Sequence, residues 1–219
     1  MEAAQLQPRR KPQGLGGESR MGRPPLSERR KAAARLEIAK AAVELFTAQG
    51  VEGTSAGEIA EAVGISTRTL WRYFPSKEDC VAPLLASGAE RLSRRLGDWP
   101  VGRPLIEALD DDDLWLADSD PDTLRVVLDL MRLTRTEPGL QSVWMRKTFD
   151  ALPVVADALA ARANKPVADM EARVQAGMLL SALHLALREY AWREPGEDGP
   201  ELDEMLRQAA RIVIRGLPF

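Results

Sequence analysis

The 219-residue chain has few of the residue types that build catalytic centres and covalent frameworks. It contains one cysteine, Cys80, one histidine, His184, and only 5% aromatic residues. A single cysteine excludes an internal disulfide and suits a reducing compartment. No run reaches the roughly 18 apolar residues of a membrane span, and no apolar stretch follows the basic N-terminus as it would in a secretory signal. We therefore expect a cytoplasmic protein that does not enter membranes.

The same scarcity argues against an enzyme. The sequence has no Gly-rich phosphate loop and no set of nucleophile, base and orienting group, so we expect neither catalysis nor a cofactor. Four consecutive carboxylates, Asp110 to Asp113, raise the alternative of a metal site. Consecutive residues of a helix point in different directions and do not converge on one ion. We interpret the run as a solvated acidic face and expect no bound metal.

Charge is distributed unevenly along the chain. Residues 1–80 contain 13 Lys and Arg against 10 Asp and Glu, whereas the remainder contains 17 against 23. Within residues 1–35 the count is 9 against 3. A basic N-terminal end on an acidic body is typical of a protein that touches a polyanion with one end.

Residues 54–79 predict two short helices joined by a tight turn. Ser55 and Glu58 have the spacing of a capping box, in which each side chain binds the backbone N–H of the other residue. Ile59 and its neighbours then recur at helical spacing. Gly64 stands where the first helix must stop, because a sharp turn favours a residue that adopts positive φ.

The second helix begins at Ser66 or Thr67, ends before Pro75, and is too short to be stable unless it is packed. It offers only Leu70 and Phe74 to a core. Its other side chains are cationic, hydroxylic or aromatic with a polar tip, which are the groups that contact phosphates and base edges. The pattern favours a helix-turn-helix with a recognition helix; a plain helical hairpin with a solvated face is the alternative.

Residues 27–80 resemble the DNA-binding domain of the tetracycline-repressor (TetR) family. The resemblance rests on the segments GVEGTS, IAEAVGIS and TLWRYFPSKE, which occur in this order. Two positions depart from the family pattern: Arg68 replaces a common Gly, and Trp71 replaces a common Tyr. Both fall on the DNA-facing side, so operator preferences do not carry over from the family.

The remaining chain reads as helices, and no strand pattern appears. Residues 1–26 are rich in Pro, Gly and Arg, and we expect them to be a disordered basic arm when free. The helices are expected at 27–49, 76–96, 105–116, 121–136, about 140–164, 166–193 and 201–216. Pro83 either bends its helix or marks its beginning, and Pro153 either kinks its helix or divides it. The resemblance implies an all-α protein with three parts: an arm (1–26), a helix-turn-helix domain (27–80) and a helical ligand-binding and dimerisation domain (81–219).

Candidate site residues follow from the pattern and from the resemblance. For DNA we expect phosphate contacts from Thr54, Thr67, Tyr73 and Lys77, and base-edge or adjacent phosphate contacts from Arg68, Thr69, Trp71 and Arg72. Arg23, between Gly and Pro on the slender arm, suits a narrow minor groove, although a passive tail is an equal alternative. Candidates for a ligand pocket are Trp115, Leu128, Met131, Arg132, Trp144, Met145, Phe149, Met178 and His184, each of which is also a plausible core residue.

These features together predict a homodimeric repressor. It would bind a pseudo-palindromic operator in double-stranded DNA and be released by a small, largely apolar effector. Small residues in the last long helices allow the close approach of a four-helix dimer bundle. The alternative is an architectural DNA-binding protein without a ligand.

Deletion of residues 1–26 should lower operator affinity and flatten its dependence on salt. Each lost phosphate contact should reduce the slope of log K against log salt by about 0.9. Titrations of the full and truncated chains over a range of salt concentrations measure this slope. An unchanged slope would make the arm a passive tail.

Overall fold

The computed structural model describes residues 26–100, 103–104, 107, 120–193 and 198–216. The described part of the chain is entirely helical, as predicted. Its elements are α1 (Leu26–Gln49), α2 (Ala56–Ala62), α3 (Thr67–Tyr73), η1 (Glu78–Val81), α4 (Ala82–Asp98), α6 (Pro121–Leu133), α7 (Pro138–Arg162), α8 (Met170–Ala191) and α9 (Leu202–Arg215). The expected helix at 105–116 and the carboxylates at 110–113 lie outside the described residues.

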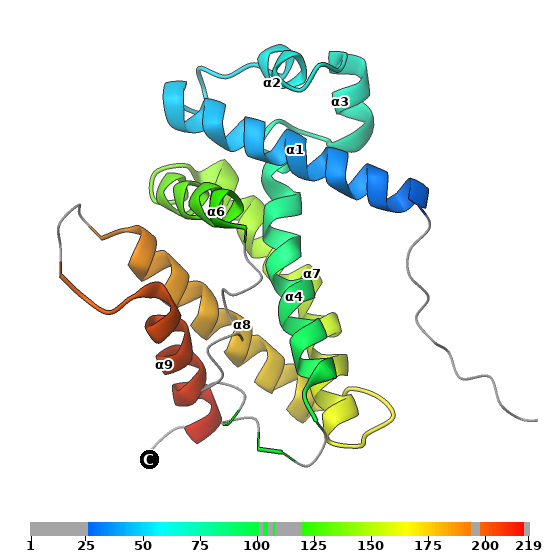
Figure 1. The fold of residues 1–219 in the computed structure, drawn as a ribbon, viewed down its shortest axis with the longest axis vertical. Helices are drawn as coiled ribbons and strands as arrows, with labels where there is room; N and C mark the ends of the chain where they lie inside the picture. Colours follow the sequence, from blue (N-terminus) through cyan, green and yellow to red (C-terminus); the bar gives the residue numbers. More distant parts are fainter. Residues whose placement is uncertain (1–25, 101–102, 105–106, 108–119, 194–197, 217–219) are drawn as a thin grey trace, which may run out of the picture.

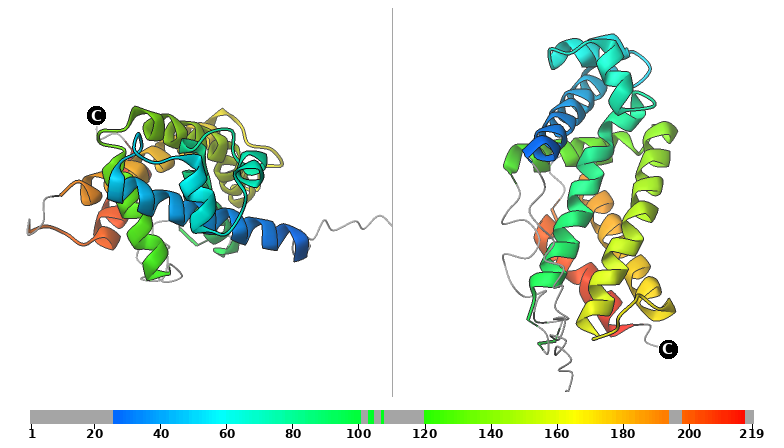
Figure 2. Two further views of the ribbon diagram at one scale, coloured as in Figure 1. Left: turned by 90° about the horizontal axis from the view of Figure 1, so that it is seen from above. Right: turned by 90° about the vertical axis from the view of Figure 1, so that its right-hand side faces the viewer.

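The helices form two parts that we call the head and the body. The head comprises α1, α2, α3 and η1 and lies at one end of the molecule (Figure 1). The body comprises α6 to α9. Helix α4 begins in the head and runs down the body beside α7, as the right-hand view of Figure 2 shows. Any shift of α4 relative to the body therefore moves the base of the head.

The head is built around the short helices that the sequence predicts. The capping box between Ser55 and Glu58 is present at the start of α2, and Ser66 caps α3. Gly64 has a φ of 68°, the positive value expected for the turn between the two helices. Leu70 and Phe74 are only 0% and 4% exposed, because they pack into the core formed with α1.

A lysine fastens the loop between α1 and α2. The ammonium of Lys77 donates hydrogen bonds to the carbonyls of Val51, at 2.6 Å, and Thr54, at 2.9 Å. The side chain of Thr54 is 1% exposed and donates to the carbonyl of Gly50 at 2.8 Å. Together these bonds hold the chain between α1 and α2 against the segment that follows α3.

Several predicted boundaries change for identifiable reasons. Pro83 lies in the first turn of α4, so it marks the beginning of that helix and does not bend it. Helix α7 runs unbroken through Pro153, which excludes two separate pieces. The predicted start of α8 at Pro166 is wrong: the side chain of Asp169 accepts a bond from the Ala172 N–H at 2.9 Å and caps a helix that begins at Met170.

The other predicted ends are close to the observed ones. Helix α6 ends at Leu133, three residues earlier than expected, and α9 ends before Gly216, whose φ is 72°. Among the helices that the structure describes, none combines the length and the apolar character needed to cross a membrane.

Replacing Lys77 with methionine should destabilise the head. The change keeps the aliphatic stem but removes the ammonium that donates to two loop carbonyls, of which the Val51 carbonyl keeps only the Thr54 N–H at 3.3 Å. The expected cost is about 1–3 kcal/mol in the free energy of unfolding. Urea unfolding measures this loss. The control is Lys31→Met, which removes an exposed lysine paired with Glu28 and should change stability little. Equal stability of the two variants would contradict the fastening role.

Candidate DNA-binding surface and internal cavity

The outer face of α3 is free of acidic residues and rich in donors. Thr67, Arg68, Trp71 and Arg72 are exposed, and the exposed fraction of the Trp71 side chain, 45%, is high for an indole. The Thr69 side chain is half-buried, with its hydroxyl 2.9 Å from that of Ser66 at the cap. Cationic, hydroxyl and indole N–H groups on one exposed face suit phosphate and base-edge contacts in a major groove.

Arg35 of α1 supports the end of α3. Its guanidinium donates to the carbonyl of Tyr73 at 3.1 Å and lies 5.9 Å from the centre of the Tyr73 ring and 5.6 Å from that of Phe74. Tyr73 is half-buried. A cation held over two rings fixes the orientation of the last turn of the recognition helix.

Two of the side chains that we expected at phosphates are engaged inside the head. Thr54 is buried and hydrogen-bonded, and the ammonium of Lys77 already binds two carbonyls. Their placement gives both a structural role in holding the loop next to the DNA-facing surface. Arg23 lies outside the described residues. The structure thus places Thr67, Arg68, Trp71 and Arg72 on one exposed surface. Thr69 and Tyr73 are half-buried beside this surface, and Thr54 and Lys77 are engaged inside the head.

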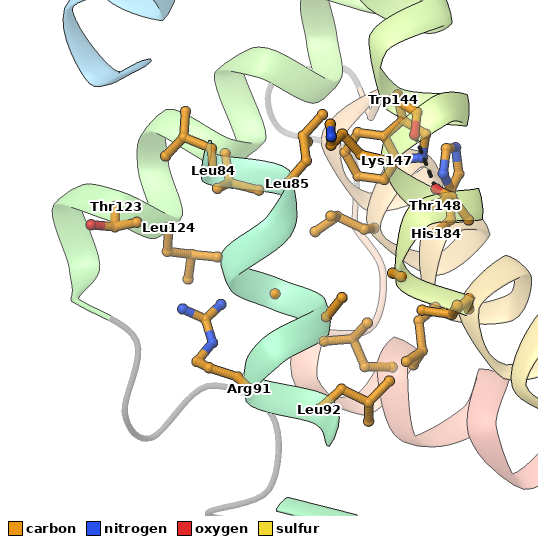
Figure 3. A pocket seen from close by; sticks show the side chains of 18 residues that line it. Leu84, Leu85, Arg91, Leu92, Thr123, Leu124, Trp144, Lys147, Thr148 and His184 are labelled. Atoms are coloured by element: carbon orange, nitrogen blue, oxygen red, sulfur yellow. Dashed lines mark hydrogen bonds between the residues drawn. The ribbon is translucent and has the colours of Figure 1, made fainter. Parts of the chain in front are cut away.

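The body contains an apolar cavity of about 190 Å³ beside α4. Figure 3 shows α4 on one side of this space and Trp144, Lys147, Thr148 and His184 of α7 and α8 on the other. Helices α6 and α9 contribute the remaining walls. Most of the lining is aliphatic: Leu84, Leu85, Gly88, Ala89, Leu92, Leu124, Val127, Ala151, Leu180, Leu183, Leu187 and Leu206. A partly open apolar cavity of this kind suits a small apolar molecule.

Trp144 and His184 form the polar side of the cavity. Their rings meet edge to face, with centres 4.3 Å apart. Burial, with a smaller contribution from the positive charge of Arg188, lowers the pKa of His184 to about 4. The imidazole is therefore neutral near pH 7 and carries one donor and one acceptor nitrogen.

The ligand residues expected from the sequence are distributed over three environments. Trp144 and His184 line the cavity, whereas Met131 is 0% exposed in the core and Leu128 packs beside it. The exposed side chains of the set are Arg132, Met145, Phe149 and Met178. Trp115 lies outside the described residues.

Sequence reasoning missed the α4 wall of the cavity and its α6 wall. The spacing of Leu84, Leu85 and Leu92 shows an inner face of a helix, but an inner face next to a void has the same pattern as one next to a core. No sequence signal distinguishes the two.

Two contacts connect the wall of the cavity to the head. Arg146 of α7, which lies between the cavity residues Trp144 and Lys147, forms an ion pair with Asp79 of η1. The carboxylate of Asp79 also accepts a hydrogen bond from the Ser76 hydroxyl at 3.0 Å. Gly139, the second residue of α7, lies so close to Glu78 that a Cβ there would be 3.2 Å from its Cγ. Helix α7 therefore touches both the cavity and η1, the segment that follows the recognition helix.

No group of three or more potential metal-binding side chains occurs within the described ranges. Cys80, the one thiol, is buried, and burial raises its pKa to about 12. A thiol in this state is a poor nucleophile.

Comparison with known proteins identifies both halves of the chain. Residues 38–84 match the family of bacterial regulatory proteins called tetR, and residues 103–218 match the MftR C-terminal domain. TcmR, an HTH-type transcriptional regulator from Streptomyces glaucescens, is 29% identical over 150 residues, covering 64% of this chain and 64% of TcmR. MftR from Mycobacterium tuberculosis is 43% identical over 60 residues, 27% of each chain. This chain therefore spans less than two thirds of either relative.

Solved structures show the same fold at low identity. The fatty acid degradation regulator FadR from Bacillus halodurans has a TM-score of 0.53 at 16% identity, with 84% of this chain and 96% of that chain covered. GusR from Salmonella enterica has a TM-score of 0.51 at 20% identity, with the same coverage of 84% and 96%. With both family matches and an all-helical fold of this type, the chain belongs to the TetR family of transcriptional regulators, which are DNA-binding proteins and not enzymes.

Proposed function

We propose that this regulator is a homodimeric repressor that leaves its pseudo-palindromic operator when a small, largely apolar effector enters the cavity. The observation that carries this proposal is the position of Leu84. Its side chain is 2% exposed, belongs to the core beneath α3 and also lines the cavity. A molecule that enlarges the cavity presses on a residue of the same buried cluster that contains Leu70 of the recognition helix.

Release from DNA requires that the effector bind one state of the protein better than the other. A tenfold weakening of operator binding needs about 1.4 kcal/mol of such preference. An effector in the cavity can change the orientation of the head by two routes. It can displace α4 at Leu84, and it can strain the ion pair between Arg146 and Asp79. Either change can favour a head orientation that does not fit DNA.

We assign DNA recognition to the exposed face of α3. Arg68 lies in the first turn of the helix, and residues near the start of a recognition helix reach base edges. Trp71 lies three residues later on the same face. Thr67, Thr69, Arg72 and Tyr73 fit backbone or neighbouring base contacts around them. We retain Arg23 as a minor-groove contact. Operator binding would place the protein in the cytoplasm with the chromosome.

The dimer is proposed to form through an apolar face of α8. Met170, Val174, Met178 and Leu185 recur at intervals of four or seven residues, which places them on one side of the helix. Their exposed fractions are 74%, 51%, 38% and 49%. A second copy is the partner that fits, because a two-fold dimer lets this face cover its own counterpart and gives two heads for two half-sites.

We also keep the division at residues 1–26, 27–80 and 81–219 as a proposal. The first test of the function is a search of the promoter DNA next to the gene for a palindrome, followed by mobility-shift titration. Preference for the palindrome over random DNA at raised salt supports an operator-specific regulator. Equal affinity for both would favour an architectural protein.

Arg68→Ala should weaken binding to the operator by about 1–3 kcal/mol and relax sequence preference at one position of each half-site, because Arg68 is proposed to read a base edge. Mobility shifts on the operator and on single-base variants measure both effects. The control, Arg94→Ala on α4, removes an exposed arginine away from α3 and should leave affinity unchanged. A uniform loss on all DNA would reassign Arg68 to a phosphate.

Val174→Glu should dissociate the dimer without unfolding the protomer, because the side chain is exposed in the single chain and would be buried with its counterpart in the dimer. Sedimentation velocity measures the change in mass, and operator affinity should fall with it. Gln175→Glu adds the same carboxylate on a different face of α8 and is the control. A Val174→Glu chain that stays dimeric would exclude this face.

A further inference from the structure

We propose that the cavity selects uncharged, compact molecules of about one ring, largely apolar, whose single hydroxyl or carbonyl group pairs with the imidazole of His184. This inference rests on the effector role proposed for the cavity and adds the chemical class of the effector and the residue that anchors it.

The size of the cavity limits the ligand. An engineered apolar cavity of about 150 Å³ binds benzene. The cavity of about 190 Å³ is slightly larger. It therefore accommodates one ring with one or two short substituents. The aliphatic walls contributed by α4, α6, α8 and α9 favour hydrocarbon over polar surface.

The cationic residues of the lining are already engaged. The ammonium of Lys147 lies 2.6 Å from the carboxylate of Asp150, and Arg91 has an interaction of its own within the protein. An anionic ligand would have to compete with these partners and lose its hydration in a mostly aliphatic space, which is costly. The cavity therefore disfavours a charged effector.

The hydroxyl groups of the lining are engaged as well. Thr148 donates to the carbonyl of Trp144 at 3.1 Å, and the Thr123 hydroxyl donates to the carboxylate of Asp120 at 2.6 Å. Two groups of the lining have no hydrogen-bond partner within the described part of the chain: the buried indole N–H of Trp144 and the ring nitrogens of His184. The indole can only donate, whereas the imidazole can both donate and accept.

The chemistry of His184 defines the complementary group. A buried imidazole whose pKa is lowered to about 4 stays neutral and offers one donor and one acceptor. A ligand hydroxyl can satisfy either nitrogen, and a carbonyl can accept from the protonated one. A hydrocarbon without such a group would leave both nitrogens unsatisfied in a partly dehydrated site.

Two probes of nearly equal shape test the assignment: p-cresol and p-xylene, which differ by a hydroxyl in place of a methyl group. Calorimetric titration of the full chain, without DNA, gives the ratio of their affinities. His184→Phe should shift this ratio about tenfold against p-cresol, because the phenyl ring fills the space but cannot form the hydrogen bond. Ser142→Ala, which removes a hydroxyl of α7 that lies outside the cavity lining and is used inside the protein, should leave the ratio unchanged.

The wild-type protein supplies a test that needs no variant. His184 is the only histidine of the chain, so its imidazole nitrogen resonances are unambiguous. Saturating p-cresol should move them to hydrogen-bonded positions, whereas saturating p-xylene should not.

Several results would overturn the inference. These are an unchanged affinity ratio in His184→Phe, nitrogen resonances that respond alike to both probes, failure of both probes to bind, or tighter binding of 4-methylbenzoate than of p-cresol. The proposed function fails separately: if p-cresol binds through His184 but no such ligand releases the operator, the cavity assignment stands and the effector role does not.

Discussion

The burial of Leu70 and Phe74 is the contact on which the rest of the molecule depends. Helix α3 has seven residues and cannot be stable alone. It keeps its shape because these two side chains enter a core made by α1, α2 and the start of α4. The side chains of Thr67, Arg68, Trp71 and Arg72 are then exposed and available for contacts at the surface. The long helix α1 thus serves as a platform for α3. The loop before α2, which Lys77 holds in place, helps to fix the orientation of α3 toward DNA.

This platform is continuous with the body. The buried cluster beneath α3 includes Val126, Leu130 and Met131 of α6 and Leu140 and Val143 of α7. The head and the body therefore share one packed core and do not move as independent units. A second cluster lies lower, around Val155 and Ala176. The cavity lies next to both, where α4 passes from one to the other, so a change in its filling alters packing at the joint between head and body.

Sequence reasoning succeeded where local chemistry decides the structure. The capping box at Ser55, the positive φ at Gly64 and the short recognition helix all follow from residues close together in the chain. It failed at one local boundary, the start of α8, and in the placement of side chains that depends on residues distant in the chain. Asp169 was overlooked as a cap because Pro166 gave a stronger start signal. Phe149 and Met178 were expected in the pocket, yet they lie on the surface, since an apolar residue on the exposed side of a helix can have the same spacing as one that faces a ligand.

Leu84 lies both in the core beneath α3 and in the cavity wall, and this constrains which substitutions the regulator can accumulate. A substitution there would reshape the cavity and at the same time change the support of α3, so new ligand preference would cost DNA-binding competence. Leu180 and Leu183 line the same space from α8 and pack against the second cluster, away from the one that holds α3 in place. Drift in effector specificity among descendants of this protein should therefore accumulate on α8, while position 84 stays a large aliphatic residue.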